Sequence, residues 1–402
     1  VMRVGIIGKP NTGKTTFFNA ATLSHAQVAS YPFTTINPNV GITYLRVDCV
    51  HKELGVKDNP INSICINGNR FIPVELVDVA GLVPDAWKGR GLGNKFLDDL
   101  RRADALIHVV DASGGTDEEG RIIALGTHDP LLDVDFVEKE FDLWLLQIIK
   151  RDWQRISRTA EAGTEKISSM IAERLSGLSI TEKQIIESMD ALKLVHDKPT
   201  SWTEEDLFNL CRSIRMASKP IIIAANKADL STSAKNIERL KAKKRLVIPC
   251  AAEAELLLRR AAEKGLIEYI PGDSSFRIIN PDKLTLEQKK AFDLVNDKVF
   301  KVYGNTGVQQ IINSAYFDLL KSIVVYPVED EKRFSDKAGN VLPDAYIMRE
   351  GSTAKDLAYK IHTELGEGFL YAIDAKRGNR LSADYKLKDK DVIKIVSSAK
   401  RV

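Results

Sequence analysis

Short apolar runs alternate with polar or glycine-rich turns along the first third of the chain. Three of these runs, 4–7, 74–77 and 106–110, have the character of buried strands. A fourth run of the same character lies much later in the chain, at 221–225. Helical patterns lie between them. Continuous apolar strands that alternate with helices are typical of a mostly parallel sheet with both faces covered. The pattern therefore predicts an α/β sheet domain.

The character changes between 133 and 215, where apolar residues recur at helical spacing. These apolar positions are Phe141, Leu145, Ile148, Ile149, Ile167, Met170, Ile171, Leu175, Ile185, Met189 and Leu192. Acidic and basic residues are closely mixed on the remaining positions, which is typical of solvated helix faces. The segment is predicted to be a helical, coiled-coil hairpin with a break near 176–179.

The last part of the chain predicts a separate α+β module. Residues 271–273 (Pro-Gly-Asp) end the sheet domain, and 282–320 have a helical pattern. Strands are then expected at 322–326 and 391–396, with a helix at 353–365 between them. The predicted organisation is a discontinuous sheet domain of 1–132 and 216–272, a helical insertion of 133–215, a helical connector of 273–321 and a C-terminal module of 322–402.

The composition of the 402 residues is ordinary, with 44% hydrophobic and 28% charged residues. This is close to the average for globular proteins, and the length suggests two or three domains. The net charge is only +3, so nothing in it demands a nucleic-acid partner. There is no signal-peptide pattern and no apolar stretch near the roughly 20 residues that span a bilayer. We expect a soluble, cytoplasmic monomer.

Cysteine and histidine spacing gives no sign of a metal site. The four cysteines are far apart in the sequence and form no CxxC pair; they are Cys49, Cys65, Cys211 and Cys250. This spacing argues against a zinc site or a disulfide framework and fits a reducing compartment. His108 and His128 lack metal-like partners at a suitable spacing, so both are expected to be structural or surface residues.

Residues 8–15 (GKPNTGKT) match the phosphate-loop pattern GxxxxGK[ST] at every required position. They follow an apolar strand and precede a helical run, which is the context that this pattern requires. Glycines let successive backbone N–H groups point at phosphate oxygens, and the helix N-terminus adds positive charge. Lys14 should reach the β- and γ-phosphates, and the Thr15 hydroxyl should bind Mg²⁺. The predicted nucleotide-binding residues here are Asn11, Thr12, Gly13, Lys14, Thr15 and Thr16.

Two further segments are expected to respond to the γ-phosphate. Asp78 begins a DxxG pattern at the carboxyl end of a predicted strand, where it can hold Mg²⁺ through water. The backbone amide of Gly81 can then contact the γ-phosphate. Thr35, or alternatively Thr34, can give Mg²⁺ a second hydroxyl, so Thr35 is a predicted metal ligand with Thr15 and Asp78. A structural turn around Pro32 is the competing interpretation.

The run Asn-Lys-Ala-Asp at 226–229 predicts recognition of guanine. Asp229 can accept hydrogen bonds from guanine N1–H and the 2-amino group, whereas adenine offers no such donors there. Leaving such a carboxylate unpaired costs roughly 1–3 kcal/mol or more, so the site can reject the wrong base. Asn226 is expected to tie the loop together, and the Lys227 stem to lie over the base. In the fifth loop, a backbone amide of Ala251 or Ala252 is expected to contact guanine O6.

These motifs carry a family resemblance. The segments that resemble the Obg family of translation-factor-type GTPases are 8–16, 31–41 and 78–83. The run 89–97 (GRGLGNKFL), with a helical insertion before the fourth motif, is most similar to the YchF subfamily. The segments 341–345 and 389–393 resemble a TGS domain, a ubiquitin-like module. The resemblance implies a P-loop G domain with a coiled-coil insertion and a TGS domain, and a ribosome- or translation-associated role.

One departure from that family bears on the nucleotide. Bacterial and eukaryotic YchF proteins typically lack the aspartate of the fourth motif and prefer ATP. This sequence keeps Asn226, Lys227 and Asp229, which favours GTP and is similar to an archaeal-type member.

Hydrolysis is expected to be slow. Leu82 stands where Ras-like enzymes place a glutamine that orients water, so catalysis should depend on Mg²⁺ and backbone amides, with Lys14, Thr35 and Gly81 as the predicted catalytic residues. Related GTPases use an asparagine at the position of Asn11 to bind K⁺, which predicts faster turnover in potassium. A plain turn residue is the equal alternative.

A basic group follows the second switch segment; its members are Lys88, Arg90, Lys95, Arg101 and Arg102. They can face ribosomal RNA, or be solvated or paired with Asp98 and Asp99. The leading interpretation is a GTPase that acts as a ribosome-associated switch. The alternatives are an ATPase like many YchF relatives, and a nucleotide-gated RNA- or ribosome-binding scaffold whose hydrolysis is incidental.

Overall fold

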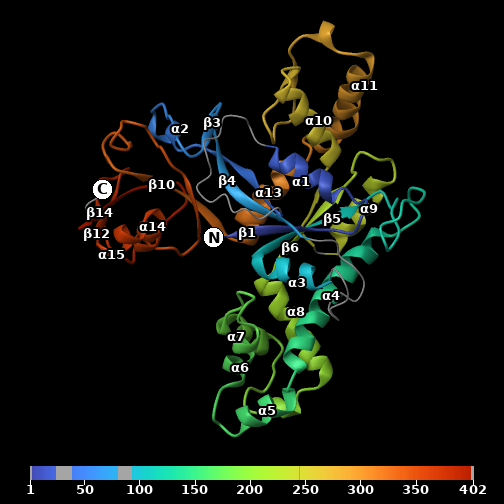
Figure 1. Cartoon of the computed structure of the whole chain (residues 1–402), viewed down its shortest axis with the longest axis vertical. Helices are drawn as coiled ribbons and strands as arrows, with labels where there is room; N and C mark the ends of the chain where they lie inside the picture. The colour runs from blue at the N-terminus through green and yellow to red at the C-terminus, as the bar shows by residue number, and fades with distance from the viewer. Residues whose placement is uncertain (1, 24–38, 80–92, 244, 400–402) are drawn as a thin grey trace. The chain divides into compact units, whose positions relative to one another are not determined.

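The computed structural model describes residues 2–23, 39–79, 93–243 and 245–399 (Figure 1). Its contacts divide the chain into two compact units. The first comprises Val1–Ala21, Asn39–Gly41 and Glu75–Ile311; the second comprises Thr22–Pro38, Ile42–Val74 and Ile312–Val402. Within the described residues, no helix combines the length and the apolar character that crossing a membrane requires.

The largest sheet has seven strands in the order β2-β4-β1-β5-β6-β7, and β3 pairs with β4. Its strands are β1 (Arg3–Ile7), β2 (Val40–Asp48), β3 (Ile64–Ile66), β4 (Asn69–Asp78), β5 (Ala105–Asp111), β6 (Ile221–Asn226) and β7 (Val247–Pro249). The pairs β1–β4, β1–β5, β5–β6 and β6–β7 are parallel, whereas β3 and β4 are antiparallel. The mostly parallel sheet predicted from the apolar runs is confirmed.

Helices bury the apolar faces of these strands. The helices packed around the sheet are α1 (Lys14–Thr22), α3 (Gly93–Arg102), α4 (Pro130–Lys150), α8 (Glu204–Ser218), α9 (Ser233–Ala242) and α10 (Ala252–Glu263). One core joins Ile7 and Leu106 of the sheet to Leu145 of α4. Another joins Ile223 of β6 to Leu240 of α9. All seven residues of β5 are buried, which explains why its sequence is apolar except at His108 and Asp111.

The helical segment between β5 and β6 contains five α-helices. The long helices α4 and α8 pack against each other, as a hairpin requires. Three shorter helices lie between them in sequence: α5 (Trp153–Glu161), α6 (Ile167–Arg174) and α7 (Glu182–Ala191). The predicted break near 176–179 is present between α6 and α7. The segment is therefore a small helical bundle rather than a plain two-helix hairpin, because its apolar positions bury against several short helices.

After α10 the first unit continues with a small hairpin and short helices. They are β8 (Ile267–Glu268), β9 (Arg277–Ile278), η3 (Pro281–Lys283), α11 (Leu286–Val295), η4 (Asn296–Phe300) and α12 (Lys301–Tyr303), and α13 (Val308–Ser314) spans the boundary with the second unit. The second unit contains η5 (Ala315–Leu319) and, much earlier in the chain, α2 (His51–Leu54). The helical pattern predicted for 282–320 is therefore present.

The second unit contains a five-stranded sheet in the order β11-β10-β14-β12-β13. Its elements are β10 (Ser322–Val328), β11 (Tyr346–Arg349), α14 (Ala354–Ile361), α15 (Thr363–Glu367), β12 (Phe369–Asp374), β13 (Arg380–Leu381) and β14 (Asp391–Ser397). Leu357 of α14 packs with Val325 and Ile393 in one core. The expected α+β module is present.

Candidate nucleotide-binding site

The loop between β1 and α1 is shaped by close backbone approaches. Gly13 has φ +92°, and a Cβ on it would lie 2.1 Å from Nδ2 of Asn226. A Cβ on Gly8 would lie 2.9 Å from the carbonyl oxygen of Val109. Only glycine fits both positions. Helix α1 begins at Lys14, so the loop ends at a helix N-terminus, which favours anions.

Lys14 and Asp78 form an ion pair at the foot of this loop. Lys14 Nζ lies 2.5 Å from Asp78 Oδ1 and donates to the carbonyl of Val79 at 2.8 Å. Asp78 ends β4, which pairs directly with β1, so the two motifs are adjacent through the sheet. The Asp78 carboxylate thus binds a cation, the Lys14 ammonium group. Thr15, the next residue of α1, is exposed and offers a hydroxyl oxygen. Two oxygen donors of this kind fit Mg²⁺.

Asn226 connects three loops. It is only 3% exposed, and its side-chain amide donates to the carbonyl of Thr12 at 2.9 Å. Its Oδ1 accepts from the backbone N–H of Ala252 at 3.0 Å and from the Cys250 thiol at 3.5 Å. The phosphate loop, the NKAD loop and the fifth loop are thus held by one side chain.

Other bonds fix the NKAD loop against its neighbours. Lys227 has φ +59°, and its Nζ donates to the carbonyl of Asn11 at 2.7 Å and pairs with Asp111 at 3.2 Å. The hydroxyl of Tyr303 donates to the carbonyl of Ala228 at 2.7 Å. Asp229 is exposed and has no hydrogen-bond or ion-pair partner within the described part of the chain. Its carboxylate is therefore available to a ligand.

These loops enclose a cavity of about 500 Å³. The residues that line it are Lys9, Pro10, Asn11, Gly13, Lys14, Thr15, Thr16, Ile122, Asn226, Lys227, Asp229, Leu230, Ala251, Ala252 and Glu253. Of the predicted nucleotide-binding residues, Thr12 alone is absent from this lining, because its side chain is buried and donates to the carbonyl of Lys9 at 3.0 Å. The sequence did not point to Ile122, an apolar side chain that is 77% exposed at this cavity.

A largely buried polar cluster of Lys9, Asp133 and His128 packs next to the phosphate loop. Lys9 Nζ lies 2.7 Å from Asp133 and donates to the carbonyl of Thr116 at 3.2 Å. His128 contacts the other oxygen of Asp133 at 2.9 Å. His108 is fully buried in β5, and burial, reinforced by the charge of Lys9, lowers its pKa to about 3. Both histidines occupy structural positions.

Several predicted residues lie outside the described part of the chain. They are Pro32, Thr34, Thr35, Gly81, Leu82, Lys88 and Arg90. The side chain of Lys95 is likewise not described. Arg101 and Arg102 are exposed on α3, and Arg101 lies 3.7 Å from Asp98.

Two of the cysteines that are far apart in the sequence lie together in space. Cys211 and Cys250 are buried separately, but Cys49 and Cys65 lie together with His51 and Asp58 in the second unit. Burial raises the pKa of the Cys250 thiol, and the charge of Asp229 adds to this.

Three family models match successive parts of the chain. A 50S ribosome-binding GTPase model matches 3–135, the G4 motif-containing domain of YGR210-like Obg-like GTPases matches 224–330, and a TGS domain matches 338–397.

Known proteins match nearly the full length. The chain is 55% identical over 399 residues to an uncharacterized GTP-binding protein of Methanocaldococcus jannaschii, covering 99% of each. It is 28% identical to the ribosome-binding ATPase YchF of Bacillus subtilis, covering 92% of this chain and 87% of that protein. A crystal structure of a GTP-binding protein from Pyrococcus horikoshii matches with a TM-score of 0.76 and 44% identity, covering 98% of this chain and all of that one.

Proposed function

Because the chain belongs to the YchF-type subfamily of Obg-like P-loop GTP-binding proteins, we propose that it binds GTP and hydrolyses it slowly to GDP and phosphate. The observation that carries this proposal is the arrangement of Asn226, which joins the base-recognition loop to the phosphate loop, with the free carboxylate of Asp229 at the same cavity. A guanine seated there offers two donors to Asp229, and adenine offers none.

We expect different groups of the chain to bind the phosphates and the metal ion. Lys14 exchanges its contact with Asp78 for the β- and γ-phosphates, and the N-terminus of α1 binds the same anions. Thr15 and Asp78 would hold Mg²⁺, which when bound neutralises phosphate charge. Leu82 cannot orient water, so turnover stays well below the 5–20 s⁻¹ known for activated GTPases of other kinds.

The switch is a change in the segments that contain Thr35 and Gly81. Both are placed by the motif order to respond to the γ-phosphate. The Lys14–Asp78 pair supports this role, because Lys14 Nζ lies 2.5 Å from Asp78 Oδ1 and a phosphate that binds Lys14 therefore acts directly on the residue that begins the DxxG segment. Binding of phosphate at Lys14 is thereby linked to Asp78, the last residue of β4.

Calorimetric titration with GDP, GTP and ATP tests the base preference. The wild-type chain should bind GTP at least about tenfold more tightly than ATP, since an unpaired carboxylate costs roughly 1–3 kcal/mol. Asp229→Ala should lose this preference. Tighter binding of ATP by the wild type would instead favour an ATPase, which is what the bacterial relative is named.

We also propose that the chain associates with ribosomes in the cytoplasm in a nucleotide-dependent way. The support is the ribosome-binding name of the B. subtilis relative and of the family model matching 3–135. Cosedimentation with ribosomes should be stronger with one nucleotide state and should weaken as salt rises, because phosphate contacts release counterions. Equal, salt-insensitive binding in all states would contradict it and favour a passive scaffold that contacts no phosphates.

A potassium requirement would come from Asn11. Its Nδ2 donates to the carbonyl of Gly120 at 2.8 Å, which leaves its Oδ1 without a partner among the described residues. A carbonyl oxygen beside the phosphate loop can bind K⁺. Hydrolysis should then be faster in potassium than in sodium at equal ionic strength, and equal rates would remove this proposal.

A further inference from the structure

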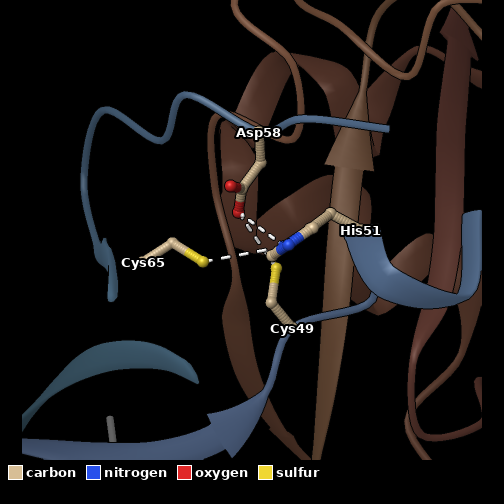
Figure 2. A group of neighbouring side chains, drawn as sticks. All are labelled: Cys49, His51, Asp58 and Cys65. Atoms are coloured by element: carbon tan, nitrogen blue, oxygen red, sulfur yellow. Dashed lines mark hydrogen bonds and ion pairs between the residues drawn. The ribbon is translucent and has the colours of Figure 1, made fainter. Parts of the chain in front are cut away.

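Four metal-ligating side chains meet in the second unit, and none of them lines the nucleotide cavity. Cys49 follows β2, His51 begins α2, Asp58 lies in the loop after α2, and Cys65 is the central residue of β3. Figure 2 shows the four side chains directed at one another from these four segments. Their ligand atoms all lie within 4.8 Å of one another.

Three of the separations between the ligand atoms are close to those of a tetrahedral metal site. Asp58 Oδ2 lies 3.1 Å from the Cys49 Sγ and 3.2 Å from the His51 Nδ1. Cys65 Sγ lies 3.6 Å from the same histidine nitrogen. Tetrahedral zinc with Zn–S of about 2.3 Å and Zn–N of about 2.0 Å places its ligand atoms roughly 3.3–3.8 Å apart. These three separations are within a few tenths of an ångström of that range, and all the others are at most 4.8 Å, so small side-chain movements bring the four groups onto one ion.

Backbone hydrogen bonds and turns position the segments that carry the ligands. The N–H of Cys49 donates to the carbonyl of Gly68 at 2.9 Å, which fixes it to the turn between β3 and β4. Cys65 is paired with Arg70 across the β3–β4 hairpin. Gly55 ends α2 with φ +68°, a left-handed conformation that directs the chain back toward Asp58.

The charges balance when a divalent cation is added. Arg70 is fully buried, and its Nη2 donates to Asp58 Oδ2 at 2.8 Å. Two thiolates and one carboxylate carry three negative charges, which a divalent ion and the Arg70 guanidinium neutralise together. Buried charges are tolerated when they are paired in this way. Arg70 also orients the carboxylate, as groups behind metal ligands commonly do.

We propose that these four side chains bind one structural Zn²⁺ ion. Two thiolates, an imidazole and a carboxylate form a closed four-coordinate set, with no position left for substrate. Zinc suits this mixed set of sulfur, nitrogen and oxygen donors better than Mg²⁺ or Ca²⁺, which prefer oxygen alone.

The ion fixes a loop that supports the C-terminal module. Between the ligands Asp58 and Cys65, the N–H of Asn59 donates to the carbonyl of Val341 at 3.1 Å, and that of Ile61 to Pro343 at 2.9 Å. Arg70 adds a bond to the carbonyl of Leu342 at 3.1 Å. Metal binding therefore orders the loop that carries these bonds, all within the second unit, and slows hydrogen exchange in 56–63 and 340–344.

Cobalt substitution tests the site on the full-length, reduced chain. After removal of metal with a chelator, wild type should take up one equivalent of Co²⁺ with tetrahedral ligand-field absorption and thiolate-to-cobalt charge-transfer bands, and Zn²⁺ should displace it. Cys49→Ser and Cys65→Ser should each weaken Co²⁺ binding at least tenfold. Cys211→Ala, which changes a buried cysteine of the helical bundle, should retain the full spectrum.

A reduced wild-type chain that gives an octahedral spectrum without thiolate bands, or that binds Co²⁺ no better than Cys65→Ser, would overturn the site. GDP binding serves as the folding control for each variant. If the serine variants fail to fold, the wild-type spectrum decides alone, because thiolate bands require cysteine ligands. Since GDP binding is measured separately, failure of the zinc site leaves the proposed GTPase function untouched.

Discussion

Asn226 donates from its side-chain amide to the backbone carbonyl of Thr12 at 2.9 Å, so the base-recognition loop is bonded directly to the phosphate loop. The same side chain accepts the N–H of Ala252 from the fifth loop. Parallel pairing of β6 with β5 and β7 brings these loops to one edge of the sheet. The loop predicted to recognise the base and the loop predicted to bind the phosphates are therefore held together by one buried side chain.

Gly13→Ala should disrupt this connection. The added Cβ would lie 2.1 Å from the Asn226 amide nitrogen, which cannot move without losing its bond to Thr12. We expect GDP affinity, measured by calorimetry, to fall by at least about tenfold, which corresponds to roughly 1.4 kcal/mol. Gly163→Ala is the matched control, because Gly163 also has positive φ but nothing lies within 4 Å of its added Cβ. An equal loss in both variants would mean that backbone strain, rather than the Asn226 contact, is responsible.

Tyr303→Phe should loosen the NKAD loop. The change removes the single hydroxyl bond to the carbonyl of Ala228 and keeps the ring. A lost hydrogen bond of this kind is worth about 1 kcal/mol, so GDP should bind roughly fivefold more weakly. The exposed Tyr359 provides the control as Tyr359→Phe. Unchanged affinity in Tyr303→Phe would show that the loop is held without this bond.

Much of the fold was predictable because its central strands are fully buried. β1, β5 and β6 have mostly apolar sequences for that reason. β2 and β3 were missed because many of their residues are only partly buried, which interrupts the apolar pattern.

At the site, the motifs predicted which loops line the cavity, but not the Lys14–Asp78 pair. That pair depends on how β1 and β4 align rather than on either motif. The meeting of Cys49 with Cys65 was hidden for a similar reason. Fifteen intervening residues separate them in sequence, and the fold brings them together because Cys65 lies in the β3–β4 hairpin and the N–H of Cys49 donates to the carbonyl of Gly68 in the turn of that hairpin.

Removing one partner of the buried pair Asp142–Arg215 should destabilise the helical bundle. Arg215 Nε donates to Asp142 Oδ1 at 2.6 Å, and both are nearly inaccessible. Burial raises the pKa of Asp142 despite the arginine, so an unpaired carboxylate here is costly. Arg215→Met should lower the free energy of unfolding by about 3–5 kcal/mol. Urea unfolding followed by tryptophan fluorescence, to which Trp144 and Trp202 of the same core contribute, measures this.

The double variant Asp142→Leu, Arg215→Met is the control for that prediction. It removes both charges, so stability should return to within about 1–2 kcal/mol of wild type. If the double variant is as unstable as Arg215→Met, packing rather than an unpaired charge explains the loss.

His108 should make the first unit sensitive to acid. Its folded pKa of about 3 lies below the ordinary value of 6.5, because burial and the charge of Lys9 disfavour the charged ring. The unfolded chain thus binds the proton more readily, so the contribution is complete above pH 6.5 and is lost as the pH falls toward 3. Between pH 7 and pH 4 this costs about 3 kcal/mol. His108→Gln should show a shallower fall in unfolding free energy over that range, and identical slopes would refute the assignment.

The most direct test of the account is nucleotide binding by Asp229→Asn. Asparagine keeps one acceptor for N1–H but places an N–H group opposite the 2-position, where guanine has an amino group and xanthine has a carbonyl. Wild type should prefer GDP to XDP, and the variant should prefer XDP to GDP, each by at least about tenfold. A variant that binds GDP as tightly as wild type would show that this carboxylate does not contact the base.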